Sequence, residues 1–198
     1  MLRIDVPEHG SLDPHGLFPA PPAELWLEIG FGAGEHLAEQ ATAHPDIGFL
    51  GAEVFENGVV KLLAEVQRRD LRNVRVLVDD ARLLLAALPD SCLGRVFILF
   101  PDPWPKQRHH KRRMVSPSTL DQLARTMKTG AELRLATDDV GYLRAMLELV
   151  PLHPAFAWQA QGPTDWLRRQ PDWPPTRYEA KALAAGRIPH FLRFTRRS

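Results

Sequence analysis

Short apolar runs alternate with stretches of helical periodicity along most of the chain. We expect strands at residues 25–29, 49–54, 74–78, 96–100 and 131–136. We expect helices between and after them, at residues 34–42, 56–69, 81–88, 116–128 and 139–150. Strict alternation of strand and helix predicts a doubly wound α/β fold, in which helices cover both faces of a mostly parallel sheet.

The two ends of the chain depart from this alternation. Residues 1–24 form a proline-rich lead, and the tail from residue 156 is less regular, with a final antiparallel strand expected at 188–195. The 18 prolines gather mainly at 7–22, 101–105 and 163–175, which marks those stretches as loops or extended connections. We therefore predict a lead at 1–24 followed by a single domain at 25–198.

Composition narrows the class of protein. A chain of 198 residues with 44% hydrophobic and 25% charged residues suits one globular domain. Cys92 is the only cysteine, so the chain has no internal disulfide and no paired-cysteine metal site. We see no signal peptide and no apolar run of the ~18–20 residues that a membrane span needs, so we expect a cytoplasmic protein. The net charge is only +1, so a nucleic-acid surface would have to come from local clustering.

Acidic residues stand at the carboxyl end of each of the five expected strands. They are Glu28, Glu53, the pair Asp79 and Asp80, Asp102, and Asp138. Parallel strands bring their carboxyl ends to one edge of the sheet, where ligands of such folds bind. The alternative is that these acids only cap the helices that follow. An acidic edge favours a ligand that carries positive charge and hydroxyl groups, as S-adenosylmethionine does.

A glycine-rich segment follows the first strand, with Gly30, Gly32 and Gly34 after Glu28. Glycines permit a tight turn and a close approach of the backbone to a ligand. The spacing is Gly-x-Gly-x-Gly followed by Glu35, and not the Gly-x-Gly-x-x-Gly of dinucleotide-binding folds. An anionic pyrophosphate is also disfavoured beside two glutamates. The segment therefore favours a nucleoside ligand that is uncharged or cationic.

The loop after the fourth strand is the most unusual part of the chain. Residues 106–113 hold five Lys or Arg, two His and no acid, a composition that attracts phosphate groups. The alternative is a solvated charged loop. We do not expect His109 and His110 to bind a metal, because no further ligand lies at metal-binding spacing. Trp104 stands between two prolines and either stacks on a base or packs over the edge of the sheet.

These segments together resemble the bacterial tRNA (guanine-N7-)-methyltransferase family. The resemblance covers most of residues 25–194 and is carried by residues 28–35, 51–54, 80–81, 101–106, 110–113, 136–138 and 176–179. The Pro-Asp-Pro-Trp-Pro-Lys block at 101–106 and the Thr-Arg-Tyr-Glu block at 176–179 are the most specific parts. The resemblance implies a Rossmann-like fold and methyl transfer from S-adenosylmethionine to N7 of the guanine at position 46, in the variable loop of tRNA.

The resemblance also implies roles for individual residues. The catalytic residue is expected to be Asp102. The cofactor-binding residues are expected to be Glu28, Gly30, Gly32, Gly34, Glu53, Asp80, Ala81 and Asp102. The substrate-binding residues are expected to be Lys106, Asp138, Thr176, Arg177, Tyr178 and Glu179. The RNA-contacting residues are expected to be Arg108, His109, His110, Lys111, Arg112 and Arg113. No metal is expected, tRNA is the expected partner, and both a monomer and a homodimer are compatible with the family.

Other interpretations remain open from the residues alone. Residues 176–179 after Pro175 would otherwise be read as a helix cap. A nicotinamide-dependent dehydrogenase is disfavoured by the glycine spacing and the acidic edge, and a non-catalytic RNA-binding protein by the five strand-end acids. A methyltransferase acting on amino groups is a further alternative, because the loop at 101–104 resembles the Asp-Pro-Pro-Tyr-type loops of those enzymes.

Overall fold

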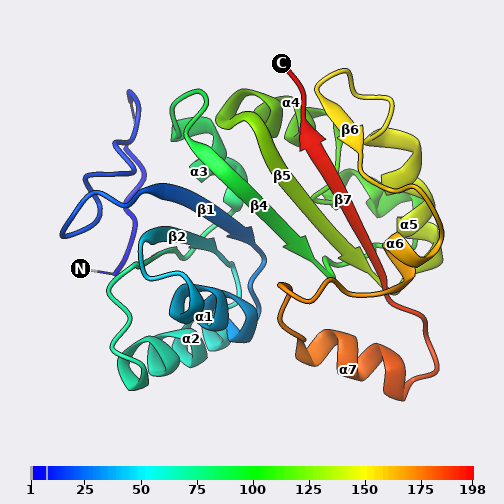
Figure 1. Cartoon of the computed structure of the whole chain (residues 1–198), viewed down its shortest axis with the longest axis horizontal. Coiled ribbons are helices and arrows are strands. Elements are labelled where there is room, and N and C mark those ends of the chain that lie inside the picture. Colours follow the sequence, from blue (N-terminus) through cyan, green and yellow to red (C-terminus); the bar gives the residue numbers. More distant parts are fainter. Residues whose placement is uncertain (1, 8) are drawn as a thin grey trace.

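The chain folds around one seven-stranded sheet with the order β3-β2-β1-β4-β5-β7-β6 (Figure 1). The computed structural model describes residues 2–7 and 9–198. The strands are β1 (Glu24–Ile29), β2 (Ile47–Ala52), β3 (Val74–Leu77), β4 (Leu93–Leu99), β5 (Met127–Thr137), β6 (Phe156–Trp158) and β7 (His190–Arg196). The first five pair in parallel, whereas β7 is antiparallel to both β5 and β6. The predicted doubly wound sheet and its antiparallel C-terminal strand are confirmed.

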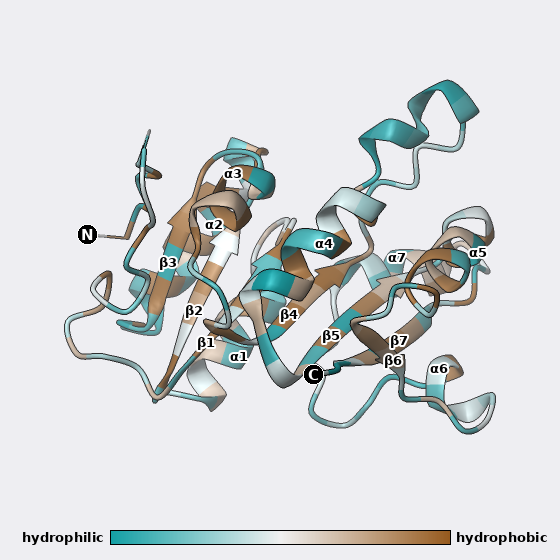
Figure 2. Cartoon of the chain, turned by 90° about the horizontal axis from the view of Figure 1, so that it is seen from above, coloured by the Kyte–Doolittle hydropathy of each residue, from teal (hydrophilic) through white to brown (hydrophobic). Residues whose placement is uncertain are grey.

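Helices lie on both faces of the sheet. The described helices are α1 (Glu35–Ala43), α2 (Glu56–Arg68), α3 (Ala81–Ala87), η1 (Gln107–Arg112, a 3-10 helix), α4 (Pro117–Thr126), α5 (Val140–Leu149), α6 (Thr164–Leu167) and α7 (Arg177–Ala184). One apolar core joins the sheet to α3, α4 and α5, and a second joins the opposite face to α1 and α2. Figure 2 shows how apolar residues concentrate in the strands between these layers.

Successive residues of a strand point to opposite faces, which explains the two cores. In β1, Leu25 and Leu27 pack toward α3, while Trp26 packs on the other face with Phe49 and Phe97. α1 and α2 cover the β1–β3 half of that face. The β4, β5 and β7 half is overlaid by residues 168–176, which carry the buried side chain of Trp173.

The predicted elements differ from the observed ones mainly after residue 100. The segment expected as an uninterrupted loop at 101–115 contains η1, and the tail contains β6, α6 and α7 in addition to the expected last strand. Ser116, Asp139 and Thr176 each accept a hydrogen bond from a backbone N–H at the start of the helix that follows. The cap reading of Thr176 is therefore confirmed, and it does not conflict with a role in binding.

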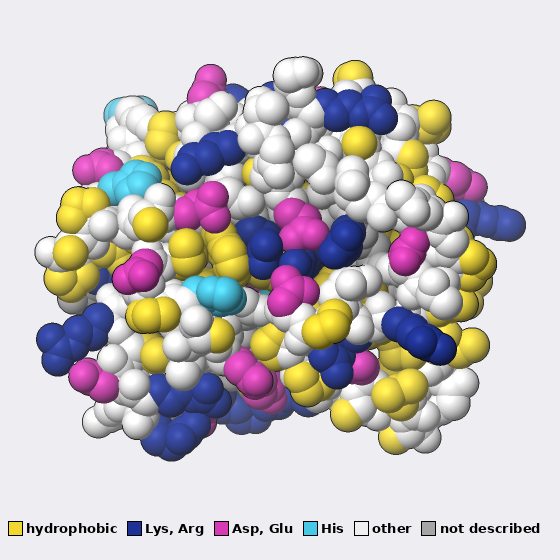
Figure 3. Space-filling view, in the orientation of Figure 1, with side chains coloured by type: hydrophobic (Ala, Val, Ile, Leu, Met, Phe, Trp, Pro, Cys, Tyr) yellow, Lys and Arg dark blue, Asp and Glu magenta, His cyan; other side chains and the backbone are white. Residues whose placement is uncertain are grey.

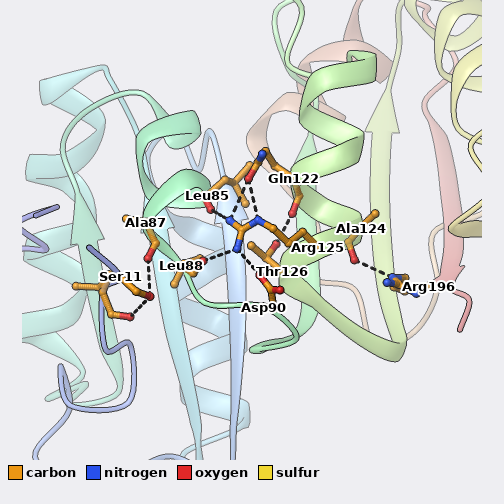
Figure 4. Close-up of polar contacts among 11 residues, drawn as sticks. Ser11, Leu85, Ala87, Leu88, Asp90, Gln122, Ala124, Arg125, Thr126 and Arg196 are labelled. Carbon is orange, nitrogen blue, oxygen red and sulfur yellow. Dashed lines mark hydrogen bonds and ion pairs between the residues drawn. The ribbon is translucent and has the colours of Figure 1, made fainter. Parts of the chain in front are cut away.

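A single arginine ties the end of α3 to α4 on the far side of the sheet (Figure 4). Arg125 donates to the carbonyl oxygens of Leu85 and Leu88 at 2.7 and 2.8 Å and to the Asp90 carboxylate at 2.7 Å. The last carbonyl groups of a helix lack partners within the helix, so these bonds satisfy the end of α3. These bonds help to fix the orientation of α3, whose first residue, Ala81, lies at the carboxyl ends of the parallel strands, where the sequence predicts the ligand site.

The described part of the lead packs along β3. Ile4 and Phe18 are buried, and the N–H of Ile4 donates to the carbonyl oxygen of Val76 at 2.7 Å. Arg75 of β3 donates to the carbonyl oxygen of Leu17 and lies over the ring of Phe18. None of the helices in the described residues has the length and apolar character needed to cross a membrane.

Candidate functional site

A cavity of about 560 Å³ lies at the carboxyl ends of the central strands. Seven of the residues predicted to bind the cofactor or the substrate line it: Gly30, Gly32, Glu53, Asp80, Ala81, Asp102 and Tyr178. They come from the ends of β1, β2, β3 and β4 and from α7, so the sheet brings together segments that are far apart in the sequence. The volume lies within the range of small-molecule and cofactor sites.

The glycine loop between β1 and α1 needs glycine at its three positions. Gly30, Gly32 and Gly34 have φ angles of 71°, 58° and 77°, a left-handed conformation that other residues adopt at a cost. A Cβ on Gly34 would lie 2.6 Å from the Leu62 side chain of α2. Gly34 therefore serves the close packing of the loop on α2 and is not among the cavity-lining residues.

Glu53 joins the glycine loop to the end of β2. Its Oε2 atom accepts a hydrogen bond from the N–H of Gly32 at 2.8 Å, and its Oε1 atom accepts from the N–H groups of Val54 and Phe55. Each carboxylate oxygen has two lone pairs, so Oε2 keeps one for a further donor. Since Glu53 lines the cavity, a ligand hydroxyl is a suitable donor for that position.

Glu28, which was predicted to bind the cofactor, is paired with His36 of α1. Its Oε2 atom lies 2.7 Å from Nδ1 of His36, both residues are buried, and Glu28 is not among the lining residues. The His36 ring packs edge-on against Phe97 at 4.8 Å between centroids. Glu28 thus fixes the start of α1 behind the glycine loop.

Acidic residues dominate the charge of the cavity wall. Glu53, Asp79, Asp80 and Asp102 line it, whereas Arg82 and Arg112 are the basic residues of the lining. Asp80 accepts from the N–H of Arg82 as the cap of α3 and also pairs with the Arg82 guanidinium at 2.9 Å. Within the described part of the chain, no three His, Cys, Asp or Glu side chains gather in a way that would hold a metal ion.

The loop after β4 places Asp102 and Trp104 at the cavity. Phe100 and Trp104 have positive φ angles of 50° and 44°, which are unfavourable for residues other than glycine. Such conformations cluster at functional sites, where surrounding contacts hold them. The Arg112 guanidinium lies 4.8 Å from the centre of the Trp104 ring, and both residues line the cavity.

The basic segment behind this loop divides into exposed and buried residues. Lys106, Arg108, His110, Lys111 and Arg112 are exposed, and His109 is half-buried. None of the Lys and Arg residues among them forms an ion pair with an acid in the described structure. A cluster of unpaired cations on the surface is suited to phosphate groups.

Arg113 is the buried member of the basic segment. It is 7% exposed, donates from Nε to the carbonyl oxygen of Pro103 at 2.8 Å, and lies 4.8 Å over the Tyr142 ring. These contacts hold the loop that carries Asp102 and Trp104 against α5. They leave Arg113 without the exposure that contact with RNA requires.

The first turn of α7 lies across the glycine loop. A Cβ on Gly32 would fall 2.8 Å from the Tyr178 ring, which shows how closely the ring covers the loop. Burial raises the pKa of the Tyr178 phenol, and the neighbouring Glu53 carboxylate raises it further, so the phenol is a neutral donor at physiological pH. Tyr178 is therefore able to hydrogen-bond an acceptor inside the cavity.

The other predicted substrate residues stand around the cavity and not in its wall. Arg177 pairs with Glu35 of α1, and Glu179 pairs with Arg169 at 3.0 Å. Asp138, at the end of β5, pairs with Arg187 at 2.6 Å. Lys106 is exposed on the loop that leads to η1. None of these four residues is among those that line the cavity.

Phe55 and Met114 line the cavity although nothing singled them out in the sequence, whereas Asp79 and Trp104, which also line it, were noted there without a final role. Asp79 lies beside Asp80, and Trp104 stands between two prolines, so both carried a signal in the sequence. Phe55 is 60% exposed although it is aromatic, and only the structure places it at the site. Nothing in the local pattern distinguishes Met114 from a residue of the core.

Comparison with known proteins agrees with this geometry. A family model described as putative methyltransferase matches residues 22–191. A tRNA (guanine-N(7)-)-methyltransferase of Rhodospirillum rubrum is 58% identical over 190 residues, which cover 96% of this chain and 74% of that protein. A protein of the same name from Paramagnetospirillum magneticum is 51% identical over 199 residues, covering 100% of this chain and 83% of the relative.

Solved structures agree in fold. The 16S rRNA methyltransferase KamB superposes with a TM-score of 0.65 at 16% identity, over 89% of each chain. A putative methyltransferase from Streptococcus mutans in complex with SAH gives a TM-score of 0.58 at 11% identity, over 88% of this chain and 89% of that one. The family model spans most of the chain, and the relatives named above match more than half of its residues over nearly its whole length. The chain therefore belongs to the tRNA (guanine-N(7)-)-methyltransferase family.

Proposed function

We propose that this protein transfers the methyl group of S-adenosylmethionine to N7 of guanine 46 in the variable loop of tRNA, in the cytoplasm. The observation that carries the proposal is a single cavity in which Glu53, Asp80 and the glycine loop face Asp102, next to an exposed basic segment. We assign residues 25–198 to the methyltransferase domain and residues 1–24 to a lead that packs on it.

The residues present fit S-adenosylmethionine. The free lone pair of Glu53 is placed to accept from a ribose hydroxyl, and Gly30 and Gly32 allow the backbone to lie close to the ligand. Asp80 and Ala81 line the same cavity at the start of α3, where they would border the base of the nucleoside. Four carboxylates in the wall favour a cationic ligand. When bound, S-adenosylmethionine supplies an electrophilic methyl group on a sulfonium.

Asp102 is the proposed catalytic residue. Guanine N7 carries an available lone pair and needs no general base before attack. The positive charge that develops on the guanine ring is stabilised by a nearby anion, and Asp102 lines the cavity just after the end of β4. Its carboxylate is suited to accept from the N1–H and amino group of guanine. Orientation and charge stabilisation then supply the rate acceleration.

The remaining predicted residues bind the substrate around this centre. Thr176, Tyr178 and Glu179 stand on the first turn of α7 beside the cavity, and Asp138 stands at the end of β5. Lys106 and Arg108 to Arg112 form the exposed surface that would bind the phosphates of tRNA. Arg113 is excluded from that surface in our proposal, because it is buried and holds the loop.

Mass spectrometry of digested tRNA tests the proposal most directly. An unmodified tRNA transcript is incubated with the protein and methyl-labelled S-adenosylmethionine, and its nucleosides are separated after digestion. We expect labelled 7-methylguanosine, and no product from a matched transcript in which adenosine replaces guanosine 46. Labelled N2-methylguanosine or N6-methyladenosine would instead establish the amino-methyltransferase alternative, and label at another guanosine would refute the assigned position.

A further inference from the structure

Helix α7 is held in place without a packed apolar face. Ala182 is its only buried residue, whereas Leu183 is 59% exposed and Tyr178 is 40% exposed. A surface helix of a globular protein normally buries a stripe of apolar residues that fixes its position. The placement of α7 beside the cavity must therefore depend on its connections to the rest of the chain (Figure 1).

The connection at its N-terminal end is residues 168–176, which we call the strap. Trp173 anchors the strap: it is 1% exposed and packs edge-on against Phe191 of β7, with 5.4 Å between ring centroids. The Arg134 guanidinium of β5 lies 5.4 Å from the centre of the Trp173 ring. The anchor therefore sits on the half of the sheet face that no helix covers.

Asp172 ties the strap to β5 and to α1. Its carboxylate accepts a hydrogen bond from Nη2 of Arg134 at 2.6 Å, and its backbone carbonyl accepts from Nε2 of Gln40 in α1 at 2.8 Å. Arg134 and Gln40 are both buried. The strap is thereby fixed relative to β5, which ends just before Asp138, and relative to α1, which begins directly after the glycine loop.

Asp172 belongs to a wider group of charges on this face. Arg134 also pairs with Glu132 at 2.8 Å, and Arg95 pairs with Glu132 at 3.2 Å and with Asp172 at 3.7 Å. Figure 3 shows basic and acidic side chains interleaved near the middle of the face. Asp172 is the one residue of this group that lies on the strap, so it carries the connection from the sheet to α7.

The chain between the anchor and the site has little freedom. Pro174 and Pro175 separate Trp173 from Thr176, and proline fixes φ. Arg169, at the other end of the strap, donates to the carbonyl oxygen of Trp173 and pairs with Glu179 of α7 at 3.0 Å. A displacement of Asp172 and Trp173 is therefore transmitted to Tyr178 and Glu179.

We propose that Asp172 is a positioning residue that holds α7 over the cavity through its bond to Arg134. The inference rests on the proposed function, since it assigns a purpose to the geometry of the α7 residues that would bind guanine. Asp172 is not among the residues that line the cavity, so it would act only through the position of α7. The proposal therefore predicts that loss of Asp172 disturbs the placement of the substrate and leaves the binding of S-adenosylmethionine nearly unchanged.

Three variants test the role of Asp172. Asp172→Ala removes the carboxylate, and Asp172→Asn keeps an oxygen that accepts from Arg134. Asp121→Ala is the control: it removes a 72% exposed carboxylate of α4 that pairs with His153 at 3.2 Å, away from the strap. We expect Asp172→Ala to lower kcat for tRNA on the order of tenfold, as a small misplacement of reacting groups does. Asp172→Asn should recover part of the loss, and the affinity for S-adenosylmethionine should change less than about threefold in all variants.

A double-mutant cycle with Glu179→Gln separates positioning from general damage. If Asp172 acts through α7, its removal should cost little further activity once Glu179 is changed, because residues that act through one another are not additive. Full additivity of the two losses would overturn the proposal. So would unchanged kcat in Asp172→Ala, or an equal loss of turnover and cofactor affinity.

Hydrogen exchange tests the anchor independently of any activity. We expect the amides of α7 to exchange faster in Asp172→Ala than in the wild type and in Asp121→Ala, while those of α5 and β4 keep their protection. Unchanged exchange in α7 would show that Asp172 does not hold this helix in place, even if the enzyme is active. If the wild-type protein forms no 7-methylguanosine, the proposed function fails, and the exchange result still decides whether Asp172 holds α7.

Discussion

Gly58, in the first turn of α2, is expected to be intolerant of even one added methyl group. A Cβ at this position would lie 2.0 Å from the carbonyl oxygen and 2.9 Å from the carbonyl carbon of Gly32. An ordinary contact begins at 3.4 Å, so Gly58→Ala requires α2 and the glycine loop to separate by about 1.4 Å, the difference between 3.4 and 2.0 Å. Both contacted atoms belong to the backbone, which a change of side-chain rotamer cannot relieve.

The expected magnitude follows from two opposing effects. Alanine is favoured over glycine within a helix by up to about 1 kcal/mol. Overpacking of a dense contact costs about 1–3 kcal/mol. We expect Gly58→Ala to lower the free energy of unfolding by about 1–2 kcal/mol, which corresponds to a Tm lower by roughly 2–8 °C in a domain of this size. The displaced loop carries the Gly32 N–H that Glu53 holds, so affinity for S-adenosylmethionine should fall about tenfold, or 1.4 kcal/mol.

Calorimetric unfolding and isothermal titration with S-adenosylmethionine measure the two effects. Gly141→Ala is the matched control, because Gly141 also lies in the first turn of a helix, α5, where a Cβ would meet only the Asp139 side chain at 3.2 Å. We expect this control to keep its Tm or to gain slightly. If Gly58→Ala melts as high as the wild type and binds the cofactor equally well, the close approach of α2 to the glycine loop is not a constraint on the site.

Three further predictions concern the loop after β4. Asp102→Ala should abolish methyl transfer while the dissociation constant for S-adenosylmethionine changes only a few-fold; a collapse of cofactor binding in titration would make Asp102 mainly a cofactor ligand. Arg108→Ala should weaken tRNA binding without changing Tm. It should also reduce the slope of log affinity against log salt concentration by about the amount that one phosphate contact contributes. Arg113→Ala should instead lower Tm, because the buried guanidinium holds Pro103 and Tyr142; equal effects of the two substitutions on Tm would contradict their different burial.

The sequence by itself determined the alternation of strands and helices from β1 to α5 and the edge of the sheet at which the site lies. Apolar runs and helical periodicity are patterns among residues that are close together in the chain, so they can be read from the sequence. Parallel pairing of the strands then brings their carboxyl ends to one edge of the sheet. This was enough to select Gly30, Gly32, Glu53, Asp80 and Asp102, all of which line one cavity. The family was also identified from the blocks at 101–106 and 176–179, and the related proteins confirm it.

The tertiary structure decided which side chains of these segments face the cavity. β1 is buried on both faces, so no local pattern tells that Glu28 pairs with His36 behind the loop. Likewise, Arg113 has the same chemistry as its exposed neighbours, and only packing against Tyr142 separates it from them. Burial on a given face depends on what covers that face, which a single strand or loop does not encode.

The position of α7 is the clearest case that the sequence left open. It depends on Gln40 meeting Asp172 across 132 residues and on Glu35 meeting Arg177 across 142 residues. Local periodicity specifies that a helix forms, because the residues concerned are neighbours in the chain. Contacts between distant residues exist only after the sheet has assembled, and for that reason the placement of the proposed guanine-binding residues became visible only in the folded chain.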